Sequence, residues 1–278
     1  MSKKDSELKG ISDYDLPSCQ AAFSCLLEVA DLFDEHHVPY LVVGGWVPSV
    51  CFPKAGHTGS VDADFLLKFS PTRENLPGSD LEKMFLEAGF RKHPDAAKWF
   101  SFVKDYQVGD FTYTVDVDLL TERYGGSSSS HRGNRVQGKK LLKITGGDYA
   151  FRFPAQRIEV RNGQSINVVD LFPYLIMKTL ALGDLKRNKP KDAYDIYMVL
   201  SHADYRKIQG QFQNLLKDSK NPDSLARRCL SIWGDFFDSP EGKGVNDVVS
   251  FFPNENPDGV ARIRQEAYQF VHQLTSEN

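Results

Sequence analysis

The chain has 278 residues, of which 41% are hydrophobic and 26% are charged, and its formal net charge is −3. This composition excludes an intrinsically disordered chain, and the length is sufficient for one large domain or two lobes with a sizeable core. The small negative charge gives no overall attraction to nucleic acid or to an anionic membrane. Any contact with RNA must therefore come from a local basic patch.

Cysteine usage and hydropathy limit the cellular setting. The four cysteines are scattered, without a Cys-x-x-Cys pair or nearby histidines, which indicates neither a zinc site nor a disulfide framework. The N-terminal residues 1–5 are polar, unlike a signal peptide, and no run of apolar residues approaches the length of a membrane span. We therefore expect a cytoplasmic protein without a membrane association.

The first predicted elements are a helix, a strand and a glycine turn. Apolar residues at helical spacing predict a helix over residues 17–36, and the run Tyr40-Leu41-Val42-Val43 predicts a strand. Gly44-Gly45-Trp46 then predicts a tight turn into a short helix. Glycine has no Cβ, so Gly44 and Gly45 let a ligand approach the backbone, although such a pair is more often an ordinary turn.

A second strand, predicted over residues 60–67, contains an acidic pair. Period-two alternation places Asp62 and Asp64 on one face and their apolar neighbours on the other. Two carboxylates on one face repel each other unless a cation lies between them. Mg²⁺ is the usual occupant, because it prefers oxygen ligands and phosphates. An Asp-x-Asp pair alone is usually a solvated strand edge, so the glycine turn before it is what indicates a site.

The middle of the chain supplies a second acidic strand and a basic segment. Periodicity and turn residues predict a helix and then two strands, over residues 80–88, 98–104 and 111–120. Asp116 and Asp118 share one face of the last strand, and each is a candidate third carboxylate. Residues 122–147 are rich in Gly, Ser, Lys and Arg. They predict a mobile basic loop, either a solvated surface or a flap over a triphosphate or RNA.

The remainder of the chain predicts a hairpin followed by helices. Asn162-Gly163 lies between two short strands, which is typical of a hairpin turn. Apolar periodicity then predicts helices over residues 171–182, 191–200, 205–216, 224–237, 246–251 and 258–274. The fold class is therefore mixed α/β (α+β), with a mixed-sheet lobe over residues 1–170 and a helical lobe over residues 171–278 that completes the active-site cleft.

Lys178 is a lone cation in the apolar helix 171–182. Burying an unpaired charge is costly, so such a lysine is normally solvent-facing or paired. Asp192 and Asp195 lie three residues apart on one face of the next helix, near its N-terminus, where carboxylates are favoured. From the residues alone, Lys178 is either a surface lysine or a phosphate contact, and Asp192 is an ordinary helix-start residue.

Together these motifs resemble the nucleotidyltransferase fold of the DNA polymerase β superfamily. The resemblance rests on Gly-Gly followed by Ser-x-Asp-x-Asp, and residues 57–64, His-Thr-Gly-Ser-Val-Asp-Ala-Asp, are similar to the AbiEii-like type IV toxin nucleotidyltransferases. Residues 170–200, an apolar helix with an internal lysine before Asp-x-x-Asp-hydrophobic-Tyr, resemble that family's second motif group. The resemblance covers about residues 40–200.

The resemblance implies transfer of a nucleoside monophosphate from an NTP, such as ATP or GTP, to an acceptor hydroxyl, with one or two Mg²⁺ ions. It implies that the metal ligands are Asp62, Asp64 and Asp118 (or Asp116). It implies nucleotide contacts at Gly44, Gly45, Ser60, Lys178 and Asp195. The late carboxylate Asp192 would orient the lysine or the acceptor. The Val-Asp-Leu-Leu sequence that ends the predicted strand 111–120 favours Asp118 over Asp116. The implied acceptor is an RNA or tRNA end or a protein, with a separately encoded antitoxin as partner.

The chain departs from the family pattern in the turn and in its spacing. Gly44-Gly45 stands where the family often has Gly-Ser, and the interval to Asp62 is a few residues longer. Two alternatives stay open at this point: a small-molecule nucleotidyltransferase of the aminoglycoside-modifying kind, and a catalytically idle nucleotide-binding or protein-interaction module.

Overall fold

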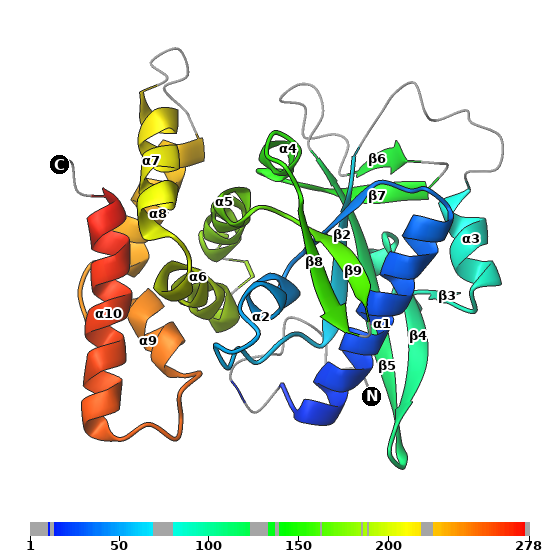
Figure 1. The fold of residues 1–278 in the computed structure, drawn as a ribbon, viewed down its shortest axis with the longest axis horizontal. Coiled ribbons are helices and arrows are strands. Elements are labelled where there is room, and N and C mark those ends of the chain that lie inside the picture. The colour runs from blue at the N-terminus through cyan, green and yellow to red at the C-terminus, as the bar shows by residue number, and fades with distance from the viewer. Residues whose placement is uncertain are drawn as a thin grey trace. The chain divides into compact units, whose positions relative to one another are not determined.

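The computed structural model separates the chain into two compact units (Figure 1). The first contains Tyr14–Cys51 and Thr58–Asp170, and the second contains Phe52–His57 and Leu171–Asn278. The structure describes residue 11 and residues 14–68, 80–122, 133–136, 139–161, 163–184, 186–187, 189–217 and 225–275.

The first unit is built on one mixed sheet. In the described part of the chain its strands are β1 Tyr40–Val43, β2 Asp62–Leu67, β3 Arg91–Lys92, β4 Ser101–Val108, β5 Phe111–Glu122, β6 Gly133–Val136, β7 Lys139–Ile144, β8 Gln156–Arg161 and β9 Gln164–Val168. The main path runs β3-β4-β5-β2-β1-β9-β8, and β7 pairs with β5 and β6. The β2/β5 and β1/β9 pairs are parallel, whereas β1/β2, β4/β5 and β8/β9 are antiparallel. The mixed sheet and the helices described below confirm the predicted fold class.

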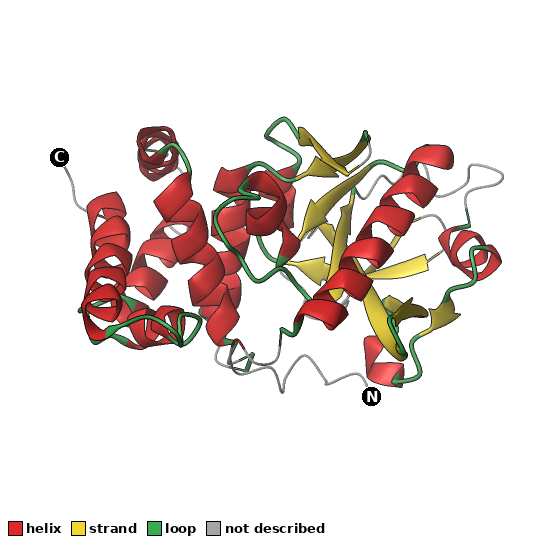
Figure 2. Ribbon diagram, turned by 60° about the horizontal axis from the view of Figure 1, so that its bottom comes forward, coloured by secondary structure: helices red, strands yellow, loops and turns green. Residues whose placement is uncertain are grey.

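The helices of the first unit surround this sheet (Figure 2). They are α1 Leu16–Glu35, α2 Trp46–Cys51, α3 Leu81–Glu87, α4 Gly147–Ala150 and a 3-10 helix, Ala96–Lys98. The predicted helices 17–36 and 80–88 and the strands 40–43 and 60–67 are confirmed. Strands β8 and β9 pair antiparallel as the predicted hairpin requires, and Asn162 of its turn lies outside the described residues. Strand β4 begins three residues later than predicted, because Asp95 caps the 3-10 turn by accepting a hydrogen bond from Ala97 N.

The prediction of a basic loop over residues 122–147 is wrong where the structure describes it. Strand β7 is antiparallel to β6 and parallel to β5, with Leu142 opposite Leu120. Leu141 is fully buried, so this segment contributes to the core despite its lysines. Residues 123–132 of the predicted flap lie outside the described residues.

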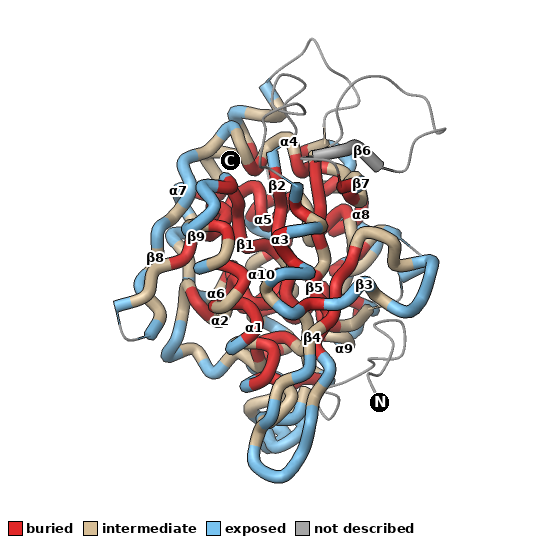
Figure 3. Tube along the Cα trace, turned by 90° about the vertical axis from the view of Figure 1, so that its right-hand side faces the viewer, coloured by how far each residue is buried: buried red, intermediate tan, exposed pale blue. Residues whose placement is uncertain are grey.

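Helix α1 packs against one face of the sheet, over β2, β4, β5 and β9 (Figure 1). Strands β1 and β2 are buried along most of their length, and β5 is buried in its second half (Figure 3). Contrary to the sequence-based expectation, α1 is long and apolar enough to cross a membrane by length and composition. Half of that window is buried inside the structure, and the core helix of a globular domain passes the same test.

The second unit is helical. Its helices are α5 Leu171–Leu182, α6 Pro190–His202, α7 Tyr205–Leu216, α8 Leu225–Phe236, α9 Lys243–Val249 and α10 Pro257–Thr275, which confirms the six predicted helices. The rings of Phe172, Phe212 and Trp233 form one core cluster, with centroids 5.0 and 4.9 Å apart. Gly183 lets α5 approach α8, because a Cβ there would lie 2.5 Å from the side chain of Ile232.

An aromatic cluster centred on Phe33 predicts a large effect on stability. Phe33 is fully buried, and its ring lies 5.2–5.8 Å from the rings of Tyr40, Phe65 and Phe85. Phe33→Ala should lower the free energy of unfolding by about 3–5 kcal/mol, since it leaves a cavity between α1 and the sheet. Urea unfolding measures this loss, and Phe33→Leu, which retains most of the volume, should cost less. Equal losses for both variants would contradict the packing described.

Candidate functional site

Four carboxylates lie on one face of the sheet in the first unit. Strands β2 and β5 are parallel, with Asp62 opposite Asp116 and Asp64 opposite Asp118. Alternation then points all four side chains away from the face on which Phe65 meets α1. The structure therefore brings together the acidic residues that were predicted from two separate segments.

The turn after β1 makes room for one of these carboxylates. Gly44 has a φ of +72°, and a Cβ built on it would lie 1.9 Å from Asp64 Oδ2. Any other residue would be strained in its backbone and would displace the carboxylate. Gly44 and Gly45 lead directly into the short helix α2, as predicted, and Val43 pairs with Asp64.

Two serine hydroxyls each hold one of these carboxylates. Ser60 Oγ donates to Asp62 Oδ1, and Ser101 Oγ, from the neighbouring strand β4, donates to Asp118 Oδ1, both at 2.5 Å. Ser60 is almost fully buried and was predicted as a nucleotide contact; here it orients Asp62.

Asp116 has a different environment from the other three acids. Its side chain is ion-paired with Lys98, and His93 Nε2 lies 3.5 Å from the same oxygen. His93 Nδ1 accepts a hydrogen bond from Asp95 N, so in neutral His93 the proton is on Nε2, facing Asp116. Asp116 is thus neutralised by a neighbouring cation, and the choice of Asp118 as the third ligand stays a prediction.

The donor atoms of this face suit Mg²⁺, because carboxylate oxygens are its preferred ligands. Among the residues that the structure describes, no three His, Cys, Asp or Glu side chains are gathered closely enough to hold one ion. These residues therefore fit a Mg²⁺ site by the chemistry of their donor atoms and by their strand positions, since Asp64 and Asp118 lie opposite each other on adjacent strands.

Lys178, Asp192 and Asp195 are brought together within the second unit. Lys178 Nζ lies 2.9 Å from Asp192 Oδ1 and 2.8 Å from Asp195 Oδ2, and its side chain is only 12% exposed. The alternative of a surface lysine is therefore wrong, because packing of α5 on α6 covers Lys178 and two acids neutralise it. The expected contact of Lys178 with a triphosphate stays a prediction.

Asp195 is the centre of this ion-pair cluster. It is fully buried and also binds Lys191 Nζ and His57 Nε2, each at 2.8 Å from Oδ1. The His57 ring stacks on Tyr194, with centroids 5.0 Å apart, and Tyr194 stacks on Phe251 at 4.5 Å. These contacts fix the segment Phe52–His57 within the second unit.

Burial and charge act in opposite directions on these groups. Burial alone would raise the pKa of Asp195, but Lys178 and Lys191 hold it well below its usual range. Burial would lower the pKa of Lys178, but Asp192 and Asp195 raise it. Burial lowers the pKa of His57 to about 4, and Lys191 acts in the same direction. His57 is thus neutral at pH 7 and donates through Nε2 to Asp195.

Several residues that bind the acidic side chains of these sites were not predicted from the sequence. Lys191 lies one helical turn before Asp195, a spacing that predicts an ion pair and was a usable signal. Ser101 and Lys98 contact their acids across 17 and 18 residues, and His57 contacts Asp195 across 138 residues. No local pattern indicates such pairs.

Removal of the Lys178 charge should destabilise the second unit. Lys178→Met leaves Asp192 and Asp195 buried with one cation fewer, which should cost about 3–5 kcal/mol of unfolding free energy. The matched control is Lys243→Met, which breaks an exposed pair with Asp247 and should cost less than about 1 kcal/mol. Urea unfolding compares the two variants. A loss for Lys178→Met as small as that of the control would contradict the buried cluster.

His57 should make stability depend on pH. Its pKa is about 4 in the folded protein and 6.5 in the unfolded chain, so between these values the unfolded chain binds more protons. Stability should then fall as the pH drops from 6.5 to 4, by about 3 kcal/mol from this group. His57→Gln removes the titrating ring, so its unfolding free energy should fall less over this range. Parallel curves for the two proteins would show that His57 does not titrate in this way.

Comparison with known proteins adds only distant similarities. No family model and no curated protein matches the chain. Among solved structures, JHP933 from Helicobacter pylori is similar at a TM-score of 0.47 and 12% identity, covering 94% of this chain and 93% of that chain. An antigenic nucleotidyltransferase-like protein from Paracoccidioides brasiliensis is similar at a TM-score of 0.43 and 13% identity, covering 75% and 93%. With identities and TM-scores this low, the similarity does not establish a family or an activity for this chain.

Proposed function

We propose that this protein is a Mg²⁺-dependent nucleotidyltransferase, which transfers a nucleoside monophosphate from an NTP to an acceptor hydroxyl. The observation that supports this most strongly is the register of β2 and β5, with Asp64 opposite Asp118 beside the Cβ-free backbone of Gly44. Acidic side chains concentrated on one sheet face next to a glycine turn suit a cation together with a polyphosphate.

We assign metal binding to Asp62, Asp64 and Asp118, whose side chains would have to close around the ion, because no three such groups of the described structure are gathered closely enough to hold one. Bound there, Mg²⁺ supplies charge neutralisation at the α-phosphate and lowers the pKa of the attacking hydroxyl. Ser60 and Ser101 each hold one carboxylate oxygen at 2.5 Å, which limits the rotation of Asp62 and Asp118. Gly44 and Gly45 would receive the β- and γ-phosphates at their backbone N–H groups.

The reaction in this proposal is a displacement at the α-phosphorus. The acceptor oxygen forms a bond to that atom, and the bond to the oxygen bridging to the β-phosphate breaks, so pyrophosphate leaves with the electron pair. The acceptor proton passes to a carboxylate of this face or to water. Asp116 takes no part, because Lys98 already neutralises it.

In the second unit, we assign Lys178 to triphosphate binding, and Asp192 and Asp195 to the positioning of Lys178. The ion pairs of 2.9 and 2.8 Å support the positioning part. A phosphate contact would then require the Lys178 ammonium to be shared between the acids and the ligand. The acceptor, an RNA or tRNA end, a protein or a small molecule, and a toxin role with an antitoxin partner are further predictions from the sequence resemblance.

Transfer can be tested directly with NTPs labelled at the α-phosphate. The protein should move label to one acceptor pool among total RNA, protein and small amine compounds, only with Mg²⁺, and should release pyrophosphate. EDTA should abolish the transfer. Tight NTP binding without label in any pool would instead support the idle nucleotide-binding module.

The carboxylates should differ in importance. Asp64→Asn and Asp118→Asn should each lower turnover at least about 100-fold, because a metal ligand is lost, whereas Asp116→Asn should lower it less than about tenfold. Steady-state pyrophosphate release measures turnover, and melting temperatures verify that each variant folds. Greater loss for Asp116→Asn than for Asp118→Asn would reverse the assignment of the third ligand.

A further inference from the structure

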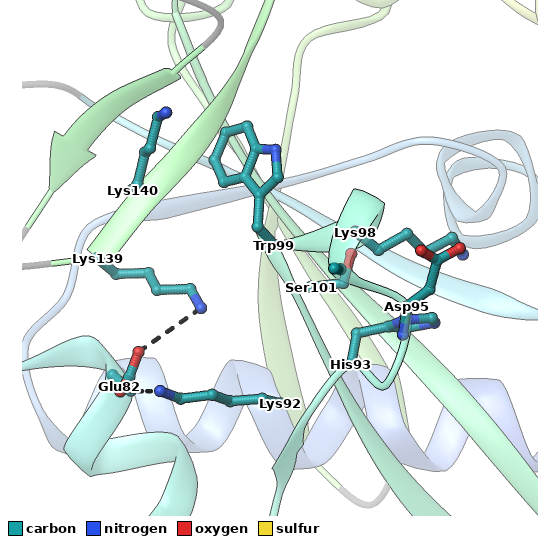
Figure 4. Close-up of a pocket in the computed structure, with 10 residues that line it drawn as sticks. Glu82, Lys92, His93, Asp95, Lys98, Trp99, Ser101, Lys139 and Lys140 are labelled. Atoms are coloured by element: carbon teal, nitrogen blue, oxygen red, sulfur yellow. Dashed lines mark hydrogen bonds and ion pairs between the residues drawn. The ribbon is translucent and has the colours of Figure 1, made fainter.

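A cavity of about 520 Å³ opens in the first unit beside the start of β4. Four lysines, Lys92, Lys98, Lys139 and Lys140, and the ring of Trp99 contribute to its lining (Figure 4). The volume lies within the range of about 300–1,000 Å³ that is typical of small-ligand sites.

The cavity lies where two strands meet the same side of β5. Strand β4 begins at Ser101, opposite Asp118, and β7 joins β5 with Leu142 opposite Leu120. Strand β2 already pairs with Leu120 on the other side, so β4 and β7 share one side of β5. Ser101 both lines the cavity and donates to Asp118. The cavity is therefore adjacent to the proposed catalytic carboxylates.

The lining has an excess of positive charge. It includes four lysines and two acids, and Lys98 is paired with Asp116 outside the lining, so three lysines remain beside Glu82 and Asp95. Asp95 uses its carboxylate to cap the backbone at Ala97. Glu82 is shared, at 2.6 Å from Lys92 Nζ and 3.8 Å from Lys139 Nζ, and Figure 4 shows both lysines directed toward it. One carboxylate thus faces two ammonium groups, which leaves charge for an anionic ligand.

Among these lysines, Lys139 gives the strongest indication of an anionic ligand. Its side chain is 8% exposed, and its Nζ lies beyond hydrogen-bond distance from Glu82 and 4.4 Å from the centre of the Phe102 ring. Burial lowers the pKa of Lys139, with Glu82 acting against it. A buried ammonium with only a distant counter-ion gains from a bound phosphate, which supplies charge-assisted hydrogen bonds.

Trp99 offers the cavity an aromatic surface. It is partly exposed, whereas Trp46 and Trp233, the other two tryptophans, are buried. Lys140 is exposed, and its Nζ lies 4.8 Å from the centre of the Trp99 ring. An indole ring beside lysines is the combination on which a nucleobase and its phosphate bind together.

We propose that this cavity binds a nucleoside phosphate, with the base against Trp99 and the phosphate at Lys139. We further infer that this nucleotide is the acceptor in the transfer, since Ser101 connects the cavity to Asp118. That second step rests on the proposed function; the binding step does not. The ligand can be a free nucleotide or the terminal nucleotide of an RNA strand, and both present the same chemistry.

Binding is tested on the full chain without NTP or Mg²⁺. AMP, adenosine, inorganic phosphate and a short single-stranded RNA are titrated by calorimetry and by tryptophan fluorescence. AMP should bind at least about tenfold more tightly than adenosine or phosphate, because only AMP uses both the ring and the lysines. AMP should also quench the fluorescence. Tighter binding of the RNA than of AMP identifies a strand end as the ligand, and equal binding identifies a free nucleotide.

Variants decide whether this cavity is the site. Trp99→Ala and Lys139→Met should each weaken AMP binding about tenfold or more, with melting temperatures that show folded protein. Trp99→Phe retains a ring, so it should abolish the quench and keep the affinity within about threefold. Lys83→Met is the control, because Lys83 is exposed and pairs only with Glu87 in the described structure.

Unchanged affinity in both Trp99→Ala and Lys139→Met, or no binding of AMP or RNA by the folded wild type, would overturn the proposal. The outcome is separable from that of the transfer assay. Binding at the cavity without any transfer rejects the proposed function and leaves the cavity assignment intact. Transfer that proceeds normally in both variants rejects the acceptor role and leaves the function intact.

Discussion

Mutual repulsion of four carboxylates on adjacent strands is the constraint on which the first unit depends. The parallel register of β2 and β5 sets them opposite each other in two pairs, so the surrounding residues must compensate. Lys98 neutralises Asp116, and serine hydroxyls hold two of the others. Gly44 provides the space that the Asp64 carboxylate occupies. A sheet optimised only for stability would not gather these charges, which is why the arrangement points to a ligand.

The second unit also gathers charged side chains, but it neutralises them by pairing acids with cations. Its charges are buried, so each must be paired, and Asp195 has Lys178, Lys191 and His57 around it. Such a cluster adds little net stability over an apolar core but penalises any arrangement that leaves one member alone. It therefore favours one packing of α5 on α6. If Lys178 also binds phosphate, the ligand has to compete with acids that are already in place.

Sequence periodicity predicted the sheet centre and the helices well, because β1, β2 and the helices have apolar faces that local spacing reveals. It failed at β7, where Lys139 and Lys140 suggested a loop. The ammonium of Lys139 lies over the Phe102 ring, a placement that composition cannot indicate. The difference between Asp116 and Asp118 also depends on partners outside β5, Lys98 of the 3-10 helix and Ser101 of β4. Alternation assigns a face, whereas Lys98 and Ser101 distinguish the two acids.

In the part of the chain that the structure describes, the second unit includes Phe52–His57 as well as the helices from Leu171 onward. A helical fragment that started at Leu171 would be missing His57, so Asp195 would lose a hydrogen-bond donor and Tyr194 a stacking partner. The helical unit is consequently not a module that a single cut at one linker can isolate intact. Its hydrophobic and ionic core is completed by a segment that comes from within the sequence of the other unit.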